Sequence, residues 1–113
     1  MKYMLLLADD PELAAADDVQ AVMQEYFDFT NRIAASGEMV AGDALHDVST
    51  ASTLRIRNGS TTVTDGPFAE TKEAIGGFYV VEVPSLDRAL ELAAMLPAAR
   101  TGGVEVRPVM EFS

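Results

Sequence analysis

Two stretches of this chain are apolar on both sides of a predicted β-strand. In the run GFYVVEV at residues 77–83, successive side chains point to opposite faces. One face carries Phe78 and Val80, and the other carries Tyr79, Val81 and Val83. The opening run YMLLLA at residues 3–8 is apolar on both faces in the same way. A sheet of such strands must be covered on both faces, because large bare apolar patches are rare on monomers.

The rest of the pattern predicts two helices and further strands around these two. Apolar residues three and four apart predict a helix from Asp17 to about Ser36, ended by Gly37. Its apolar face holds Val19, Val22, Met23, Tyr26, Phe29 and Ile33. A second helix begins after Ser85, a favourable N-cap, and ends at Pro97. Short strands are predicted at 38–45 and at 103–112.

The order of elements predicts one domain, residues 1–113, of the α+β class. The order β-α-β, a hairpin and β-α-β is typical of a ferredoxin-like βαββαβ sandwich with an extra β-hairpin. Both helices then lie on one face of an antiparallel sheet. We expect a second copy to cover the other face, which gives a homodimer through sheet faces with Tyr79 and Val81 at the interface.

The dipeptide Asn58-Gly59 is the strongest hairpin signal in the chain. A two-residue loop there pairs Arg57 with Ser60, Ile56 with Thr61, Leu54 with Val63, and Ser52 with Asp65. Leu54, Ile56 and Val63 then share an apolar face, and Asp65 lies on that side. We expect the Asp65 carboxylate to be ionised, at least half buried and bonded to backbone N–H groups of its turn.

Composition argues against several kinds of site. The chain has no cysteine, so it can form no disulfide and offers no thiolate. His46 is the single histidine, which rules out a multi-histidine metal centre within one subunit, and we expect no metal and no cofactor. The net charge of −10 disfavours nucleic acid and anionic membranes as partners. The opening residues lack a signal-peptide pattern, and we expect a cytoplasmic protein.

Three segments together resemble the YCII-related family, in its DGPF branch. They are MKYMLLL, VTDGPFAETKEAIGGFYVVEVPSLDRALELAAMLP and VEVRPVMEF. The resemblance covers essentially the whole chain and implies a ferredoxin-like fold that pairs into a dimeric α/β barrel. Relatives in the wider superfamily include small enzymes, among them muconolactone isomerases and a dehydrochlorinase.

The same resemblance bears on the active site. In the wider YCII family a histidine–aspartate pair is suggested as the active site, with the histidine on the first helix. The matching region here, around Glu25 and Tyr26, has no histidine, and His46 follows the second predicted strand instead. Members of the DGPF branch are linked to transcription through sigma factors.

The candidate catalytic residues are Asp65, His46 and Lys72. Asp65 either caps its turn or acts as a general base whose pKa depends on burial and on Lys72. Lys72 and Glu73 form a surface ion pair or line a cleft for a small ligand. His46 is an exposed loop residue or a functional group oriented by Asp47. The candidate ligand-binding residues are Tyr26, Phe68 and Glu73.

Two functional hypotheses follow, and the sequence leaves open whether the protein is an enzyme. The first is a cofactor-free enzyme that acts by proton transfer on a small organic acid. The second is a non-catalytic ligand-binding or protein-interaction module linked to transcription regulation. Convergence of His46, Asp65 and Lys72 in one pocket favours the first hypothesis.

Overall fold

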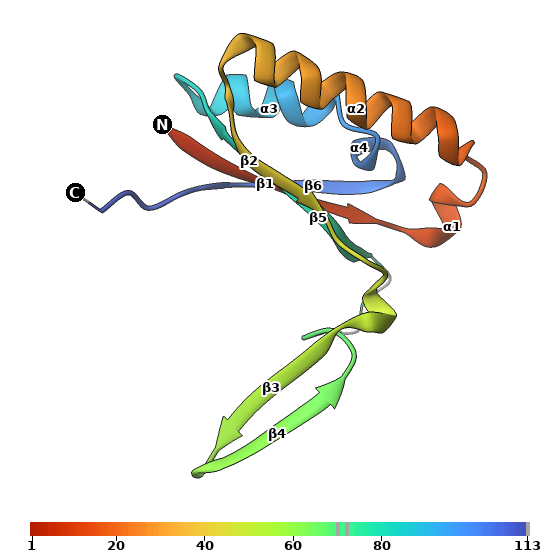
Figure 1. Cartoon of the computed structure of the whole chain (residues 1–113), viewed down its shortest axis with the longest axis vertical. Helices are drawn as coiled ribbons and strands as arrows, with labels where there is room; N and C mark the ends of the chain where they lie inside the picture. Colours follow the sequence, from red (N-terminus) through yellow and green to blue (C-terminus); the bar gives the residue numbers. More distant parts are fainter. Residues whose placement is uncertain (70, 72, 113) are drawn as a thin grey trace.

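The chain folds into a layered body and a hairpin that projects from it (Figure 1). The computed structural model describes residues 1–69, 71 and 73–112. The elements are β1 (Lys2–Asp9), α1 (Pro11–Ala14), α2 (Val19–Ser36), β2 (Met39–Ala44), η1 (Val48–Thr50), β3 (Ser52–Arg57), β4 (Ser60–Asp65), β5 (Ala74–Glu82), α3 (Leu86–Ala94), α4 (Ala98–Thr101) and β6 (Gly102–Pro108). No helix in this described part of the chain is long and apolar enough to cross a membrane.

The body contains one four-stranded antiparallel sheet in the order β2-β5-β1-β6. Strands β1 and β5, the two that are apolar on both faces, lie in the centre, and β2 and β6 form the edges. Helices α2 and α3 lie together on one side of this sheet (Figure 1). The predicted α+β, ferredoxin-like arrangement is therefore confirmed.

The helix ends follow the expected capping chemistry. The Asp18 carboxylate accepts hydrogen bonds from the backbone N–H groups of Gln20 and Ala21 at the start of α2. Gly37 ends this helix with φ of 79°, a left-handed conformation that glycine adopts at low cost. The Ser85 hydroxyl accepts from the Arg88 backbone N–H at the start of α3. The predicted boundaries are confirmed to within about two residues.

The core lies between the helices and one face of the sheet. Its buried side chains come from alternate positions of β1 and β5 and from the inner faces of α2 and α3; they include Tyr3, Leu5, Leu7, Phe29, Ile33, Tyr79, Val81, Ala89 and Leu92. This arrangement corrects one prediction. Tyr79 and Val81 pack against the helices, so they cannot form an interface with a second copy.

The opposite face of the sheet is open. Met4, Leu6, Phe78 and Val80 alternate with the core residues and are only partly buried. The register pairs Leu6 with Phe78 and Met4 with Val80, so the four side chains form one apolar stripe along the two central strands. The described helices lie on the other side of the sheet (Figure 1).

Helix α2 is buried along only part of its predicted apolar face. Phe29 and Ile33, near its C-terminal end, are buried. Val19 and Met23, near its N-terminal end, are exposed, contrary to the prediction. The C-terminal half of the helix therefore packs on the sheet, and the N-terminal half leaves space beneath it.

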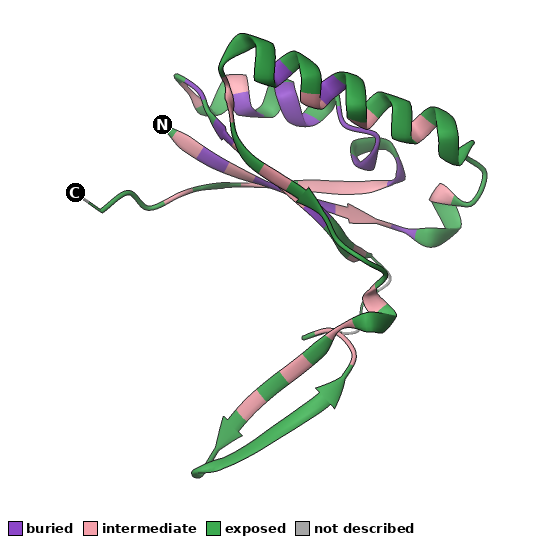
Figure 2. Ribbon diagram, in the orientation of Figure 1, coloured by how far each residue is buried: buried purple, intermediate pink, exposed green. Residues whose placement is uncertain are grey.

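The hairpin of β3 and β4 has the predicted turn and register. Asn58 and Gly59 both have positive φ, 51° and 77°, as a type I′ turn requires. Leu54 pairs with Val63 and Ser52 with Asp65. However, the apolar face has no core behind it, and Figure 2 shows both strands exposed or half-buried along their length. Asp65 is exposed as a result, which corrects the expectation that it is at least half buried.

One partly buried ion pair links the start of β2 to α3. The Arg88 guanidinium donates from Nε and Nη2 to the two carboxylate oxygens of Glu38, at 2.9 and 3.0 Å. Hydrogen bonds from Arg88, with a smaller contribution from Ser36, hold the pKa of Glu38 below its usual value. Because the pKa of Glu38 is lowered in the folded state, its ion pair with Arg88 contributes fully to stability above the ordinary glutamate pKa. This contribution is lost as pH falls through the lower pKa of the folded state.

We therefore expect the stability difference between wild type and Glu38→Gln to depend on pH. Urea unfolding should give a difference in the free energy of unfolding that is constant from pH 6 to 8. This difference should shrink below about pH 4.3, the usual glutamate pKa. Glu91→Gln removes the exposed carboxylate that also accepts from Arg88, at 2.9 Å, and should cost less. A Glu38→Gln difference that is unchanged down to pH 3 would contradict the assignment.

Candidate functional site

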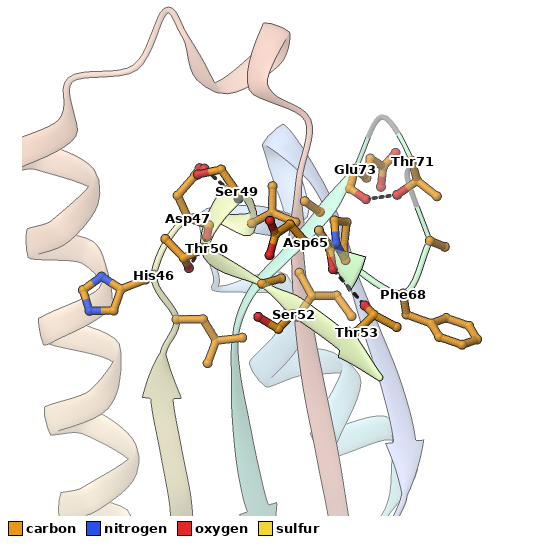
Figure 3. A pocket seen from close by; sticks show the side chains of 18 of the residues that line it. His46, Asp47, Ser49, Thr50, Ser52, Thr53, Asp65, Phe68, Thr71 and Glu73 are labelled. Atoms are coloured by element: carbon orange, nitrogen blue, oxygen red, sulfur yellow. Dashed lines mark hydrogen bonds between the residues drawn. The ribbon is translucent and has the colours of Figure 1, made fainter. Parts of the chain in front are cut away.

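Two hollows of the described chain contain the predicted site residues. The first lies where the hairpin joins the body and has a volume of about 1230 Å³ (Figure 3). Four predicted residues line it: His46, Asp65, Phe68 and Glu73. The fifth, Tyr26, lines the second hollow. The sixth, Lys72, lies outside the described residues.

The side chains around the first hollow do not converge. The His46 ring points away from Asp65, and the Phe68 ring points outward on the other side (Figure 3). Among the described residues, the Asp65 carboxylate has no hydrogen-bond partner, so the expected bonds to its own turn are not observed. The turn is closed instead by the Gly66 N–H, which donates to the Ala51 carbonyl at 2.8 Å.

Other polar groups near this hollow serve local structure. The Asp47 carboxylate accepts from the Ser49 backbone N–H at 3.0 Å and caps η1, and hydrogen bonds from Ser49 lower the pKa of Asp47. The Arg55 guanidinium lies over the Phe68 ring, 5.2 Å from its centroid, and donates to the Phe68 carbonyl. These contacts fix the base of the hairpin and leave no acid–base pair facing a common point.

The second hollow lies beneath the N-terminal half of α2 and has a volume of about 470 Å³. Helix α2 provides one wall, and β1, β2 and β5 provide the other; the lining residues are Leu7, Asp9, Met23, Tyr26, Phe27, Thr30, Met39, Gly42, Asp43, Ala44, Gly76, Gly77 and Tyr79. Met23 and Phe27 are also exposed, so the hollow opens to solvent beside them. This volume is within the range of pockets that hold small molecules.

Tyr26 lines this pocket and has a shifted pKa. Burial, and next the negative charge of Asp9, raise the pKa of Tyr26 to about 12. The phenol is therefore neutral throughout the physiological range and can donate a hydrogen bond to a ligand. The place of Tyr26 on the apolar face of the helix predicts a core residue whose hydroxyl needs a partner, and Tyr26 was also a candidate ligand-binding residue.

The remaining polar groups are held in place by contacts within the protein. The Asp9 carboxylate accepts from the Thr101 hydroxyl at 2.7 Å. The Tyr79 and Thr30 hydroxyls lie 2.8 Å apart and share a hydrogen bond. The Tyr79 ring also packs edge-on against Phe29, with centroids 5.0 Å apart. Sequence reasoning missed Asp9, Thr30 and Tyr79 because they come together only in the tertiary fold.

A close backbone approach shapes one wall of the pocket. A Cβ atom at Gly42 would lie 2.7 Å from Cδ1 of Tyr79, closer than real Cβ contacts. Strand β2 can therefore run against the Tyr79 ring only with glycine at this position.

The charges of the pocket restrict its ligand. Its lining includes two carboxylates, Asp9 and Asp43, and the described residues that line it include no lysine, arginine or histidine. A ligand that carries a carboxylate would face two like charges there. In the described part of the chain, no group of three or more histidine, aspartate or glutamate side chains could hold a metal ion.

Comparison with known proteins adds to this geometry. The family model of the YCII-related domain matches residues 1–113. An uncharacterised protein of Rhizobium meliloti (strain 1021) is 37% identical over 114 residues, 96% of this chain and 92% of that protein. A solved structure, 5-chloro-2-hydroxyhydroquinone dehydrochlorinase (TftG) of Burkholderia phenoliruptrix in complex with 2,5-dihydroxybenzoquinone, aligns with a TM-score of 0.53. The alignment covers 99% of this chain and 96% of that chain at 17% identity, and so shows likeness of fold.

Proposed function

This chain belongs to the YCII-related domain family, and we propose that it binds a small, flat, hydroxylated molecule beneath α2 and acts on it by proton transfer without a cofactor. One observation carries the proposal. A pocket of about 470 Å³ is lined mostly by apolar residues and by both Tyr26 and Asp9, and the negative charge of Asp9 acts on the Tyr26 hydroxyl.

The walls and charges of the pocket support a neutral ligand over an organic acid. Leu7, Met23 and Phe27 offer apolar contacts to the faces of a ring. Two carboxylates and several hydroxyl groups favour a ligand that donates hydrogen bonds. The fold neighbour was solved with 2,5-dihydroxybenzoquinone, a flat hydroxylated ring, which supports the same class of ligand for this chain.

The proposed step is a proton transfer that requires no redox partner. The Asp9 carboxylate removes a proton from a carbon beside a carbonyl group of the substrate, and the electron pair moves toward the carbonyl oxygen. The neutral Tyr26 hydroxyl donates a hydrogen bond to that oxygen as negative charge develops on it. Return of the proton to another carbon completes an isomerisation. The Thr101 hydroxyl positions Asp9.

The second candidate function is binding without turnover, and one observation favours it. With a pKa of about 12, Tyr26 keeps its proton near neutral pH, and a hydroxyl group that only donates a hydrogen bond is sufficient for binding. The pocket then serves a ligand-sensing or interaction module, which is compatible with a link to transcription. Proton exchange from D₂O into a bound probe separates the two functions. Only the catalytic hypothesis predicts that wild type accelerates this exchange and that Asp9→Asn does not.

Thermal shifts with two matched probes test the binding site itself. We expect 1,2,4-trihydroxybenzene, kept free of oxygen, to raise the melting temperature of the wild type. Its carboxylated analogue 2,5-dihydroxybenzoate should raise it less, because of Asp9 and Asp43. Tyr26→Phe keeps the ring but loses the hydroxyl, and should weaken binding by about tenfold.

Tyr3→Phe provides the control for this variant. Tyr3 is a buried tyrosine of the same core that does not line the pocket. Wild type and Tyr3→Phe should respond equally to the neutral probe. An equal response of Tyr26→Phe, or a larger shift with the carboxylated probe, would contradict the proposed site.

A further inference from the structure

The hairpin of β3 and β4, residues 52–65, forms an arm that stands off its own body. It leaves the sheet between β2 and β5 and extends on the side opposite to the helices, which is the side of the open sheet face (Figure 1). The chain is correspondingly extended, with a radius of gyration of 15.8 Å against about 13 Å for a compact domain of this length. The arm and the open face thus lie on the same side of the sheet (Figure 1).

The arm carries an apolar face without a partner among the described residues. Leu54, Ile56 and Val63 lie on that face, and their side chains are 58%, 59% and 63% exposed. An isolated two-stranded hairpin is marginally stable in water, and burial of one apolar face is what normally stabilises it. Among the described residues, the apolar face of this arm therefore lacks the packing partner that its alternating pattern predicts.

We infer that the arm docks on a second copy of this chain, and that the same copy covers the open sheet face. The inference goes beyond the pairing of sheet faces, because it assigns the arm a separate contact. In a twofold dimer each arm reaches across the interface and packs Leu54, Ile56 and Val63 on the body of the partner. The arm and the open face then lose their exposed apolar surface together.

Area supports a role for the arm in such a dimer. Strands spaced about 4.8 Å apart give the four-stranded face a size of roughly 19 by 24 Å, so that two paired faces bury about 900 Å². Stable interfaces bury about 1,200–2,000 Å². Two docked arms, each about 10 by 20 Å, and the surfaces that they cover add roughly 800 Å². Sheet faces alone fall short of this range, and the arms bring the total within it.

The arm differs in charge from the rest of the chain. The arm has Arg55, Arg57 and Asp65 as its charged residues, a net charge of +1 in a chain of −10, so the other 99 residues carry −11. Two such bodies repel each other. Contact of an arm with the body of a second copy opposes association less than contact between two bodies does. Arg55 and Arg57 lie on the face of the arm opposite to Leu54, Ile56 and Val63.

Neighbouring positions on opposite faces of the arm give a matched test. Val63 is on the apolar face, and Thr64 is exposed on the other face. We expect sedimentation velocity over a concentration series to show a wild-type dimer. Val63→Lys should raise its dissociation constant by about a hundredfold, since it places an unpaired charge in the contact. Thr64→Lys adds the same charge on the other face, and its dissociation constant should stay within about threefold of the wild-type value.

A second measurement guards against a change in the hairpin itself. The chain has no cysteine, so Thr61→Cys and Thr64→Cys each give one site for an environment-sensitive dye. Thr61 pairs with Ile56 on the apolar face. Emission from position 61 should shift to the blue as the protein associates, and emission from position 64 should not. A monomeric wild type, equal effects of the two lysines, or equal dye responses would overturn the inference.

Discussion

Gly102→Ala is expected to destabilise the fold by about 3–5 kcal/mol, since it forces a side chain into backbone atoms. A Cβ atom at this position would lie 1.9 Å from the Ala8 carbonyl oxygen and 2.8 Å from Cα of Asp9. Gly102 pairs with Asp9 where β6 begins, and the Asp10 N–H donates to the Thr101 carbonyl beside it at 2.7 Å. The two strands must separate to admit the methyl group. Urea unfolding measures the loss.

Gly103→Ala is the control for this prediction. Among the described residues, a Cβ atom there has one neighbour within 4 Å, the Glu73 carboxylate at 3.9 Å, which is ordinary contact. This variant should stay within about 1 kcal/mol of the wild type. Equal losses for the two variants would show that β6 does not meet β1 as described.

Aspartate at Val81 and at Val80 should have large and different effects. Val81 is fully buried against the helices, so an aspartate there leaves an unpaired charge in the core and should unfold the protein. Val80 is the adjacent residue on the open face. Val80→Asp should keep the fold and, if a second copy covers that face, convert a dimer into a monomer.

Circular dichroism and sedimentation velocity together separate these outcomes. The expected result is an unfolded or insoluble Val81→Asp and a folded, monomeric Val80→Asp. Phe78→Asp, on the same open face, should behave as Val80→Asp does. A folded Val80→Asp that remains as associated as the wild type would contradict a dimer through the open face.

Much of this fold can be predicted from the sequence because local chemistry determines it. Asp18, Gly37 and Ser85 act at helix ends through backbone hydrogen bonds or backbone conformation, and Asn58-Gly59 alone specifies its turn and register. The two-faced pattern of β1 and β5 identifies them as the central strands. Each of these features depends on residues close together in the chain.

The placement of the hairpin could not be predicted in this way. An alternating pattern shows that Leu54, Ile56 and Val63 share a face, but the same pattern arises whether that face packs on its own body or elsewhere. The expectation that Asp65 is buried came from the first alternative and is wrong in the described chain. The assignment of Tyr79 and Val81 to the open face failed for a related reason, since alternation does not say which face the helices cover.

The candidate site was only partly predictable for a different reason. The periodic helix pattern places Tyr26 on the buried side of its helix but does not show whether it lies in the core or lines a pocket. Asp9 and Tyr79 join the pocket from strands far away in the sequence, and no local motif marks them. Two other candidates were His46, which precedes the hairpin, and Asp65, which ends it, and their side chains do not converge in the folded chain (Figure 3).

Amide chemical-shift mapping with 1,2,4-trihydroxybenzene tests the proposed pocket most directly, because the two hollows involve different residues. The account predicts that the largest shifts cluster at Asp9, Tyr26, Thr30, Gly42 and Tyr79, beneath α2. Shifts confined to residues 46–53 and 65–75, at the base of the hairpin, or no saturable shifts at all, would contradict it.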